Sequence, residues 1–148
     1  MQIELREKPF DPWRELHAYQ QSLQASPGKY GATSVFVGTM RDINESDTVQ
    51  SMYLEHYPEM TSRYLEKIAE EATKEWKILD VLILHRVGHI EPDDSIVLIA
   101  TWSAHRDDAF KASRFIIEEL KHRAPFWKKE TLQDNSQRWV TNNTAANK

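Results

Sequence analysis

The chain has 148 residues, of which 40% are hydrophobic and 28% charged, a composition typical of one soluble globular domain. It contains no cysteine, which excludes disulfide scaffolds, thiolate zinc sites and cysteine nucleophiles. The net charge of -4 disfavours a general nucleic-acid binder, because such proteins are usually basic. No apolar run approaches the roughly 20 residues that cross a bilayer. The start, MQIELREKPF, is charged where a signal peptide is apolar, so we expect a cytoplasmic protein.

The first two elements follow from local patterns near the N-terminus. Gln2–Arg6 alternates apolar and polar residues, which predicts a strand. Asp11 followed by Pro12 is typical of a helix start, with Asp11 as the N-cap. We expect this helix to run to about residue 23 and to end at the Ser-Pro-Gly turn, 26–28. Its apolar candidates are Trp13, Leu16 and Leu23.

The next segment predicts two strands and a helix. Residues 31–40 (GATSVFVGTM) are rich in small and β-branched residues, which favours a buried strand. The glycines in this run also predict a close approach of neighbouring atoms to its backbone. The polar residues 41–47 predict a loop, and 49–57 alternates as a second strand. Pro58 opens a helix whose apolar stripe has three- and four-residue spacings: Met60, Tyr64, Leu65, Ile68, Ala69, Ala72 and Trp76.

The second half repeats the pattern of two strands and a helix. Residues 81–87 and Ser95–Ser103 predict strands, separated by a turn region at 88–94. A last helix is predicted from about Asp107 to Arg123, where Pro125 follows and stops it. We expect its buried face to contain Ala109, Phe110, Ser113, Ile116, Ile117 and Leu120. Short closing strands are predicted at Phe126–Leu132 and 138–140.

This order of elements indicates an α+β fold. Adjacent pairs of strands favour antiparallel pairing, whereas a doubly wound parallel sheet would need strands and helices in strict alternation. We expect a single domain over residues 1–141. Residues 142–148 (NNTAANK) are predicted to form a flexible C-terminal tail.

The densest chemical signal is the segment LKHRAPFWKKE, a basic cluster in an acidic chain. Lys121 falls in the last turn of the predicted helix and Lys128 on the following strand. The proline-bounded connection would bring their ammonium groups together, and two close ammonium groups lower each other's pKa. One lysine would then be neutral near pH 7 and able to act as a base or nucleophile. The alternative is that these cations simply stabilise a helix C-terminus.

Two arginines and a histidine indicate an anion-binding pocket. Arg41 follows a buried strand, and its guanidinium fork suits carboxylate or phosphate; a surface ion pair is the alternative. His105 and Arg106 stand where a strand ends and a helix begins, a position whose backbone N–H groups attract anions. The alternative there is an ordinary capping turn with Asp107 as the cap.

Histidine also raises the possibility of a metal site. His85 and His89 are four residues apart, and we expect both on one face of a strand. Together with His105 they could serve a metal-dependent hydrolase, although no HExxH-type ligand motif is present. The simpler interpretation is a pair of hydrogen-bonded structural histidines.

Five segments in order resemble the molybdopterin synthase large-subunit family: FVGTMRD, LEHYPEM, HRVGHI, SAHRDDAF and LKHRAPFWKKE. The resemblance covers about residues 3–140. It implies an α/β hammerhead core with additional antiparallel β structure, and a dimer of large subunits within a heterotetramer. It further implies a small ubiquitin-like partner whose C-terminal Gly-Gly thiocarboxylate supplies sulfur. The substrate would be cyclic pyranopterin monophosphate, converted to molybdopterin by two sulfur transfers, with no metal and no cofactor.

The same resemblance implies roles for particular residues. Lys121 and Lys128 match the catalytic lysines, Lys121 being the first choice for the essential one. The implied substrate-binding residues are Arg41, His105, Arg106 and Glu130, with the His-Arg pair reaching the pocket from the neighbouring subunit and Glu130 orienting Lys128. The implied pocket walls or contacts for the partner's tail are Phe36, Phe126 and Trp127. The alternative is a non-catalytic module that binds a C-terminal peptide or a phosphorylated ligand, and the paired Lys121 and Lys128 count against it.

Overall fold

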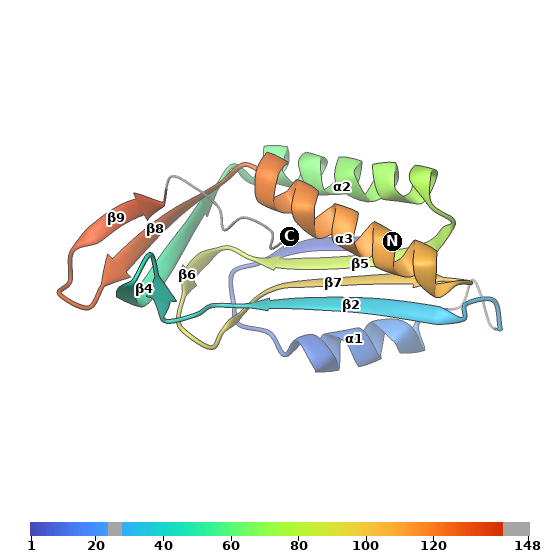
Figure 1. Cartoon of the computed structure of the whole chain (residues 1–148), viewed down its shortest axis with the longest axis horizontal. Helices are drawn as coiled ribbons and strands as arrows, with labels where there is room; N and C mark the ends of the chain where they lie inside the picture. Colours follow the sequence, from blue (N-terminus) through green and yellow to red (C-terminus); the bar gives the residue numbers. More distant parts are fainter. Residues whose placement is uncertain (24–27, 141–148) are drawn as a thin grey trace.

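Two β-sheets organise the chain (Figure 1). The computed structural model describes residues 1–23 and 28–140. The first sheet has the strand order β1 (Gln2–Arg6), β5 (Ile78–Arg86), β7 (Ser95–Ser103) and β2 (Ala32–Thr39). The second has the order β3 (Ile43–Asn44), β4 (Asp47–His56), β8 (Phe126–Leu132) and β9 (Gln137–Val140), and β6 (Gly88–Ile90) also pairs with β4.

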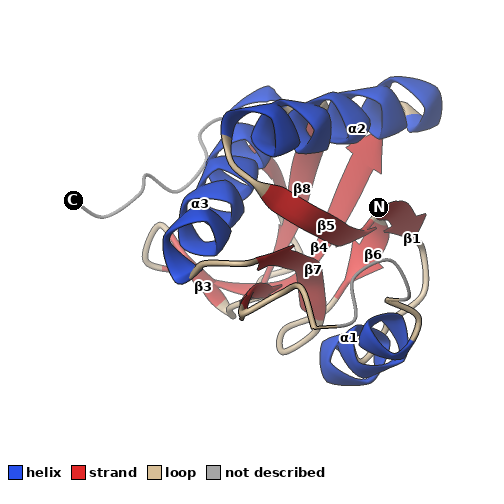
Figure 2. Ribbon diagram, turned by 90° about the vertical axis from the view of Figure 1, so that its right-hand side faces the viewer, coloured by secondary structure: helices blue, strands red, loops and turns tan. Residues whose placement is uncertain are grey.

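Helices cover both faces of the first sheet. Its strands pair antiparallel except for β1 with β5. Because side chains alternate along a strand, Ile83 and Ile99 pack under α2 (Pro58–Glu75) and α3 (Arg106–Arg123). Leu82 and Trp102 face the opposite side and pack with the residues of α1 (Pro12–Gln21). Figure 2 shows α1 across the sheet from α2 and α3.

The second sheet forms its own small core. Its buried apolar residues are Met40, Val49, Met52, Leu54, Val87 and Ile90. The chain passes from the first sheet to the second at Val87, after which Gly88 has a φ of 79°. A positive φ is accessible to glycine without steric cost, so this glycine allows β6 to turn away from β5 and pair with β4.

The expected elements and the α+β class are confirmed. The Asp11 carboxylate accepts hydrogen bonds from the backbone N–H groups of Trp13 and Arg14, at 3.0 and 3.3 Å, as an N-cap does. Close approach at the glycines of residues 31–40 is also present, since a Cβ on Gly31 would lie 2.5 Å from the Ala104 carbonyl oxygen. The α2 helix begins at Pro58, as predicted.

Several local expectations are wrong. Residues 41–47 are not simply a loop, because β3 pairs with β4 through a tight turn at Glu45 and Ser46, both with positive φ. The turn region 88–94 contains β6. The expected flexible tail, 142–148, and most of the expected turn at 26–28 lie outside the described residues.

Four residues expected to be buried are exposed instead: Trp13, Met60, Tyr64 and Phe110. On α3 the small and branched residues of the stripe, such as Ala109 and Ile116, are buried. Phe110 lies at the edge of that stripe and is 64% exposed. None of the helices in the described ranges is long and apolar enough to cross a membrane.

Candidate active site

The end of α3 and the start of β8 bring the two lysines together. Lys121 lies in the last turn of α3, which ends at Arg123. After the connection through Pro125, β8 begins at Phe126 and pairs antiparallel with β4. Side chains two residues apart on a strand share a face, so Phe126, Lys128 and Glu130 point to the same side of β8. That side faces the end of α3.

The lysine pair separates two adjoining hollows. The inner hollow is mostly apolar and is lined by Leu54, His85, Ile96, Leu120, Lys121, Ala124, Phe126 and Lys128. The outer hollow is more polar and is lined by Thr39, Met40, Arg41, Ile43, Asn44, Met52, Ile96, Lys121, Lys128, Glu130 and Val140. Both lysines therefore lie where a polar ligand from the outer side meets an apolar wall.

Burial lowers the pKa of both lysines, and for Lys128 the charge of its neighbour lowers it further. Desolvation is the main cause for Lys128, the ammonium of Lys121 is the second, and together they bring the pKa of Lys128 to about 8. Desolvation also lowers the pKa of Lys121, whereas its hydrogen bond to Lys128 and the charge of Glu118 raise it. The larger decrease is that of Lys128. A neutral amine beside an ammonium can move protons and stabilise negative charge.

A clamp of polar groups fixes Glu130 at the edge of the outer hollow. Its carboxylate is buried and accepts hydrogen bonds from Asn44 Nδ2, at 3.1 and 3.0 Å, and from Arg138 Nε, at 3.0 Å. Arg138 is held in turn by Asp47, at 2.8 Å. Glu130 acts on Lys128 through its charge, which raises the pKa of that lysine. Sequence reasoning missed Asn44 and Arg138, because only the register of β3, β4, β8 and β9 brings them to Glu130.

A buried histidine completes the inner hollow. The ring of His85 stacks on Phe126, with 4.2 Å between centroids and 13° between planes. Its Nδ1 lies 2.7 Å from the backbone carbonyl oxygen of Arg86. Desolvation lowers the pKa of His85 to about 3, so the imidazole is neutral at physiological pH. The expected same-face pair with His89 is wrong, because β5 ends at Arg86 and His89 lies exposed on the separate strand β6.

The other candidate residues are distributed over three places. Arg41 is exposed at the mouth of the outer hollow, directly after β2. His105 and Arg106 lie at the start of α3, about 24 Å from Lys121 at the helical rise of 1.5 Å per residue, so this chain does not bring them to its own lysines. Phe36 is partly exposed on β2 and does not line either hollow. Within the described ranges, no three His, Asp or Glu side chains cluster as a metal site would require.

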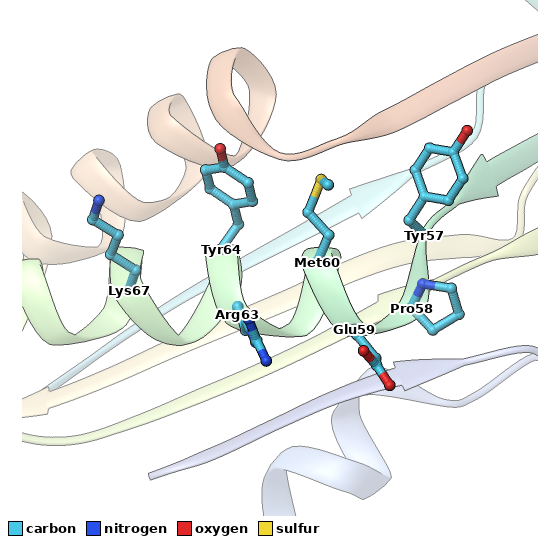
Figure 3. Close-up of a pocket in the computed structure, with 7 residues that line it drawn as sticks. All are labelled: Tyr57, Pro58, Glu59, Met60, Arg63, Tyr64 and Lys67. Carbon is cyan, nitrogen blue, oxygen red and sulfur yellow. The ribbon is translucent and has the colours of Figure 1, made fainter.

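A groove lies along the first turns of α2, on the outer surface. It is lined by Tyr57, Pro58, Glu59, Met60, Arg63, Tyr64 and Lys67. Figure 3 shows that Tyr57, Met60 and Tyr64 point to the same side of the helix. The ring of Tyr57 meets that of Trp127 edge to face, with centroids 5.3 Å apart. Trp127 thus lies on the opposite side of β8 from Lys128 and joins this groove rather than the lysine pocket.

Fold and site together define a class: a cysteine-free α+β protein with a half-buried lysine pair and an exposed arginine around one polar hollow. The chain belongs to the MoaE protein family, whose pattern matches residues 5–123.

Relatives agree with this assignment over nearly the whole chain. A molybdopterin synthase catalytic subunit from Pseudomonas aeruginosa is 46% identical over 140 residues, covering 95% of this chain and 90% of the relative. Among solved structures, the molybdopterin biosynthesis MoaE protein from Burkholderia ambifaria is 45% identical, with a TM-score of 0.76 over 94% of this chain and 88% of that one. The molybdopterin synthase from Staphylococcus aureus is 30% identical, with a TM-score of 0.81 over 93% and 96%.

Proposed function

We propose that this chain is the catalytic subunit of a molybdopterin synthase, a sulfurtransferase of molybdenum cofactor biosynthesis. The observation that carries the proposal is the pair Lys121 and Lys128, half-buried between an apolar and a polar hollow, with the pKa of Lys128 lowered to about 8. The absence of cysteine requires that sulfur come from another molecule. A small ubiquitin-like partner with a C-terminal thiocarboxylate would supply it, to cyclic pyranopterin monophosphate.

In the proposed mechanism the partner's sulfur attacks an activated carbon of the pyranopterin. A carbon–sulfur bond forms while a carbon–oxygen bond at the same carbon breaks, and the oxygen leaves with the electron pair. The ammonium of Lys121 stabilises the negative charge that develops on this oxygen. Neutral Lys128 accepts and returns protons during this step. Water then cleaves the acyl–sulfur bond, and the partner leaves as a carboxylate. A second thiocarboxylated partner repeats the transfer at the neighbouring carbon.

The phosphate of the substrate needs cations outside the lysine pair. Arg41 at the mouth of the outer hollow is one candidate. His105 and Arg106 lie about 24 Å along α3 from Lys121, so they would contribute only to the lysine pocket of a second copy. This separation supports a dimer of catalytic subunits in which each pocket is completed by its neighbour.

The groove along α2 is our candidate for docking the partner's globular part. Tyr57, Met60 and Trp127 are 62%, 48% and 45% exposed, and exposed aromatic and methionine side chains are typical of interface anchors. The groove continues through Trp127 to β8, whose opposite side bears Lys128. Phe126 lines the inner hollow and is a candidate for contact with the incoming tail; Phe36 is a weaker candidate, further along β2.

The test is a reconstitution with three components. The purified chain, a thiocarboxylated small subunit and cyclic pyranopterin monophosphate are mixed, and molybdopterin is detected as its fluorescent oxidised derivative. We expect product only when all three are present. The Lys121→Ala variant should lose at least 100-fold in turnover while remaining folded, because general acid–base and charge stabilisation contribute such factors.

Lys129→Ala is the matched control. Lys129 is next to Lys128 but points to the other side of β8, where its ammonium lies 5.7 Å from the Trp139 ring, and its loss should leave turnover nearly unchanged. Partner binding without product in the unaltered chain would indicate the non-catalytic binding module instead. Substantial turnover by a folded Lys121→Ala variant would refute the role of that lysine.

A further inference from the structure

His85 has a polar ring in a place where a hydrocarbon would pack. The residue is 4% exposed and stacks face to face on Phe126. A buried polar group without a hydrogen-bond partner is costly, so each ring nitrogen needs one. A leucine or phenylalanine would fill the same space without that requirement. The imidazole therefore calls for an account beyond packing.

One ring nitrogen is already assigned. Nδ1 lies 2.7 Å from the carbonyl oxygen of Arg86, and a carbonyl oxygen only accepts hydrogen bonds. Nδ1 must therefore carry the proton. The ring is neutral, because burial and the nearby lysines lower its pKa to about 3. In this tautomer Nε2 has a lone pair and can only accept a hydrogen bond.

The side-chain donors in the inner hollow are the two lysines. Of the residues that line it, His85, Lys121 and Lys128 have polar side chains and the rest are apolar. Lys121 lowers the pKa of His85 more than Lys128 does, which indicates that the charge of Lys121 acts on the ring more strongly. Lys121 is also the lysine that keeps its proton more readily, because its hydrogen bond to Lys128 raises its pKa and lowers that of Lys128.

We propose that His85 is a positioning residue of the lysine site: its Nε2 accepts a hydrogen bond from the Lys121 ammonium and so makes Lys121 the charged member of the pair and Lys128 the neutral one. This assignment deepens the proposed function, on which its catalytic meaning rests. Lys121 would then present a fixed ammonium to developing negative charge, while Lys128 exchanges protons. A residue that cannot accept a hydrogen bond would leave the proton distributed over both amines.

Other charges around the pair act in known directions. Glu130 on β8 raises the pKa of Lys128, and Glu118 on α3 raises that of Lys121. His56 on β4 also lowers the pKa of His85, less than either lysine does. Arg41 faces both lysines from the outer hollow. All of these groups remain in a variant of His85, so the effect of the ring can be isolated.

The first experiment measures the tautomer in the unaltered protein. Histidine labelled with ¹⁵N distinguishes a protonated ring nitrogen from an unprotonated one by chemical shift. We expect the His85 resonances of a neutral ring with the proton on Nδ1, and a change in the Nε2 shift in the Lys121→Met variant. A proton on Nε2, or an Nε2 shift that ignores Lys121, would overturn the proposal without any need for a His85 variant.

The second experiment titrates the lysines by NMR, with ¹³C at the carbon next to each amine. In the unaltered protein, Lys128 should titrate near pH 8 and Lys121 above it. In His85→Leu, we expect the Lys121 pKa to fall so that its proton dissociates about tenfold more easily, since an acceptor for the charged form is lost. His85→Gln offers an amide oxygen as a substitute acceptor and should restore most of the separation.

These readouts distinguish the outcomes. A purely structural role for His85 would lower the stability of both variants and leave the lysine titrations in place, which would overturn the proposal. Recovery by His85→Gln but not by His85→Leu, both in the titration and in turnover, would establish it. The titrations need no substrate, so they test the role of His85 even if the reconstitution yields no molybdopterin. A reconstitution without product would count only against the proposed function.

Discussion

Replacing Lys128 with methionine should stabilise the protein while abolishing its activity. Lys128 is half-buried on β8, and its pKa is about 8 against an ordinary value of 10.5. This difference in pKa means that folding disfavours the charged form of Lys128 by about 3 kcal/mol. Because the side chain keeps some contact with solvent, we expect about 1–3 kcal/mol in practice. Methionine retains the apolar stem and removes the charge, so at pH 7 the free energy of unfolding should rise by that amount.

The destabilisation caused by the buried Lys128 charge depends on pH, and its direction follows from the two pKa values. Below pH 8 the lysine is protonated in both the folded and the unfolded chain, and the full destabilisation is present. Between pH 8 and 10.5 the folded chain has released this proton while the unfolded chain keeps it, so the free energy of unfolding rises with pH. Above 10.5 both states are neutral. The advantage of Lys128→Met should therefore shrink as pH rises through this window.

Urea denaturation at pH 7 and pH 10 measures the effect directly. The unaltered protein, Lys128→Met and the control Lys129→Met are compared at each pH, so that other titrating groups cancel in the differences. Lys129 faces the Trp139 ring on the outer side of β8, and its replacement should change stability little. If Lys128→Met is no more stable than the unaltered protein at pH 7, burial of the Lys128 ammonium does not destabilise the fold, and the argument is refuted.

Two further predictions concern the partner and the acid of the site. Met60→Glu puts a charge into the α2 groove and should weaken binding of the small subunit by about tenfold to a hundredfold, measured by calorimetry. The control is Leu79→Glu, at an apolar position of similar exposure (43% against 48% for Met60). Equal effects of both variants would exclude the groove as the docking site. Glu130→Gln removes the charge that raises the Lys128 pKa, so the pH at which turnover rises should move downward, whereas Glu55→Gln on the outer side of β4 should leave it in place.

Local sequence patterns determined the elements and the position of the lysines. The Asp11-Pro12 start, the stripe of α2 and the alternation of the strands depend on residues a few positions apart, which is the range over which periodicity and capping act. The same holds for Lys121 and Lys128. The helix end and the strand start are joined by a connection too short to separate them, so their meeting in one pocket could be expected from sequence.

Only the tertiary structure decided which other groups meet those lysines. Asn44 and Glu130 are 86 residues apart, and they touch because β3, β4 and β8 pair in one register. His85 enters the inner hollow because β5 continues to Arg86 before the chain turns at Gly88, whereas the sequence alone predicted a partner in His89. Exposure of Met60 also depends on the sheet, which covers one side of α2 and leaves the other to solvent. Contacts of this kind arise from strand register and packing between distant segments, and no local pattern contains them.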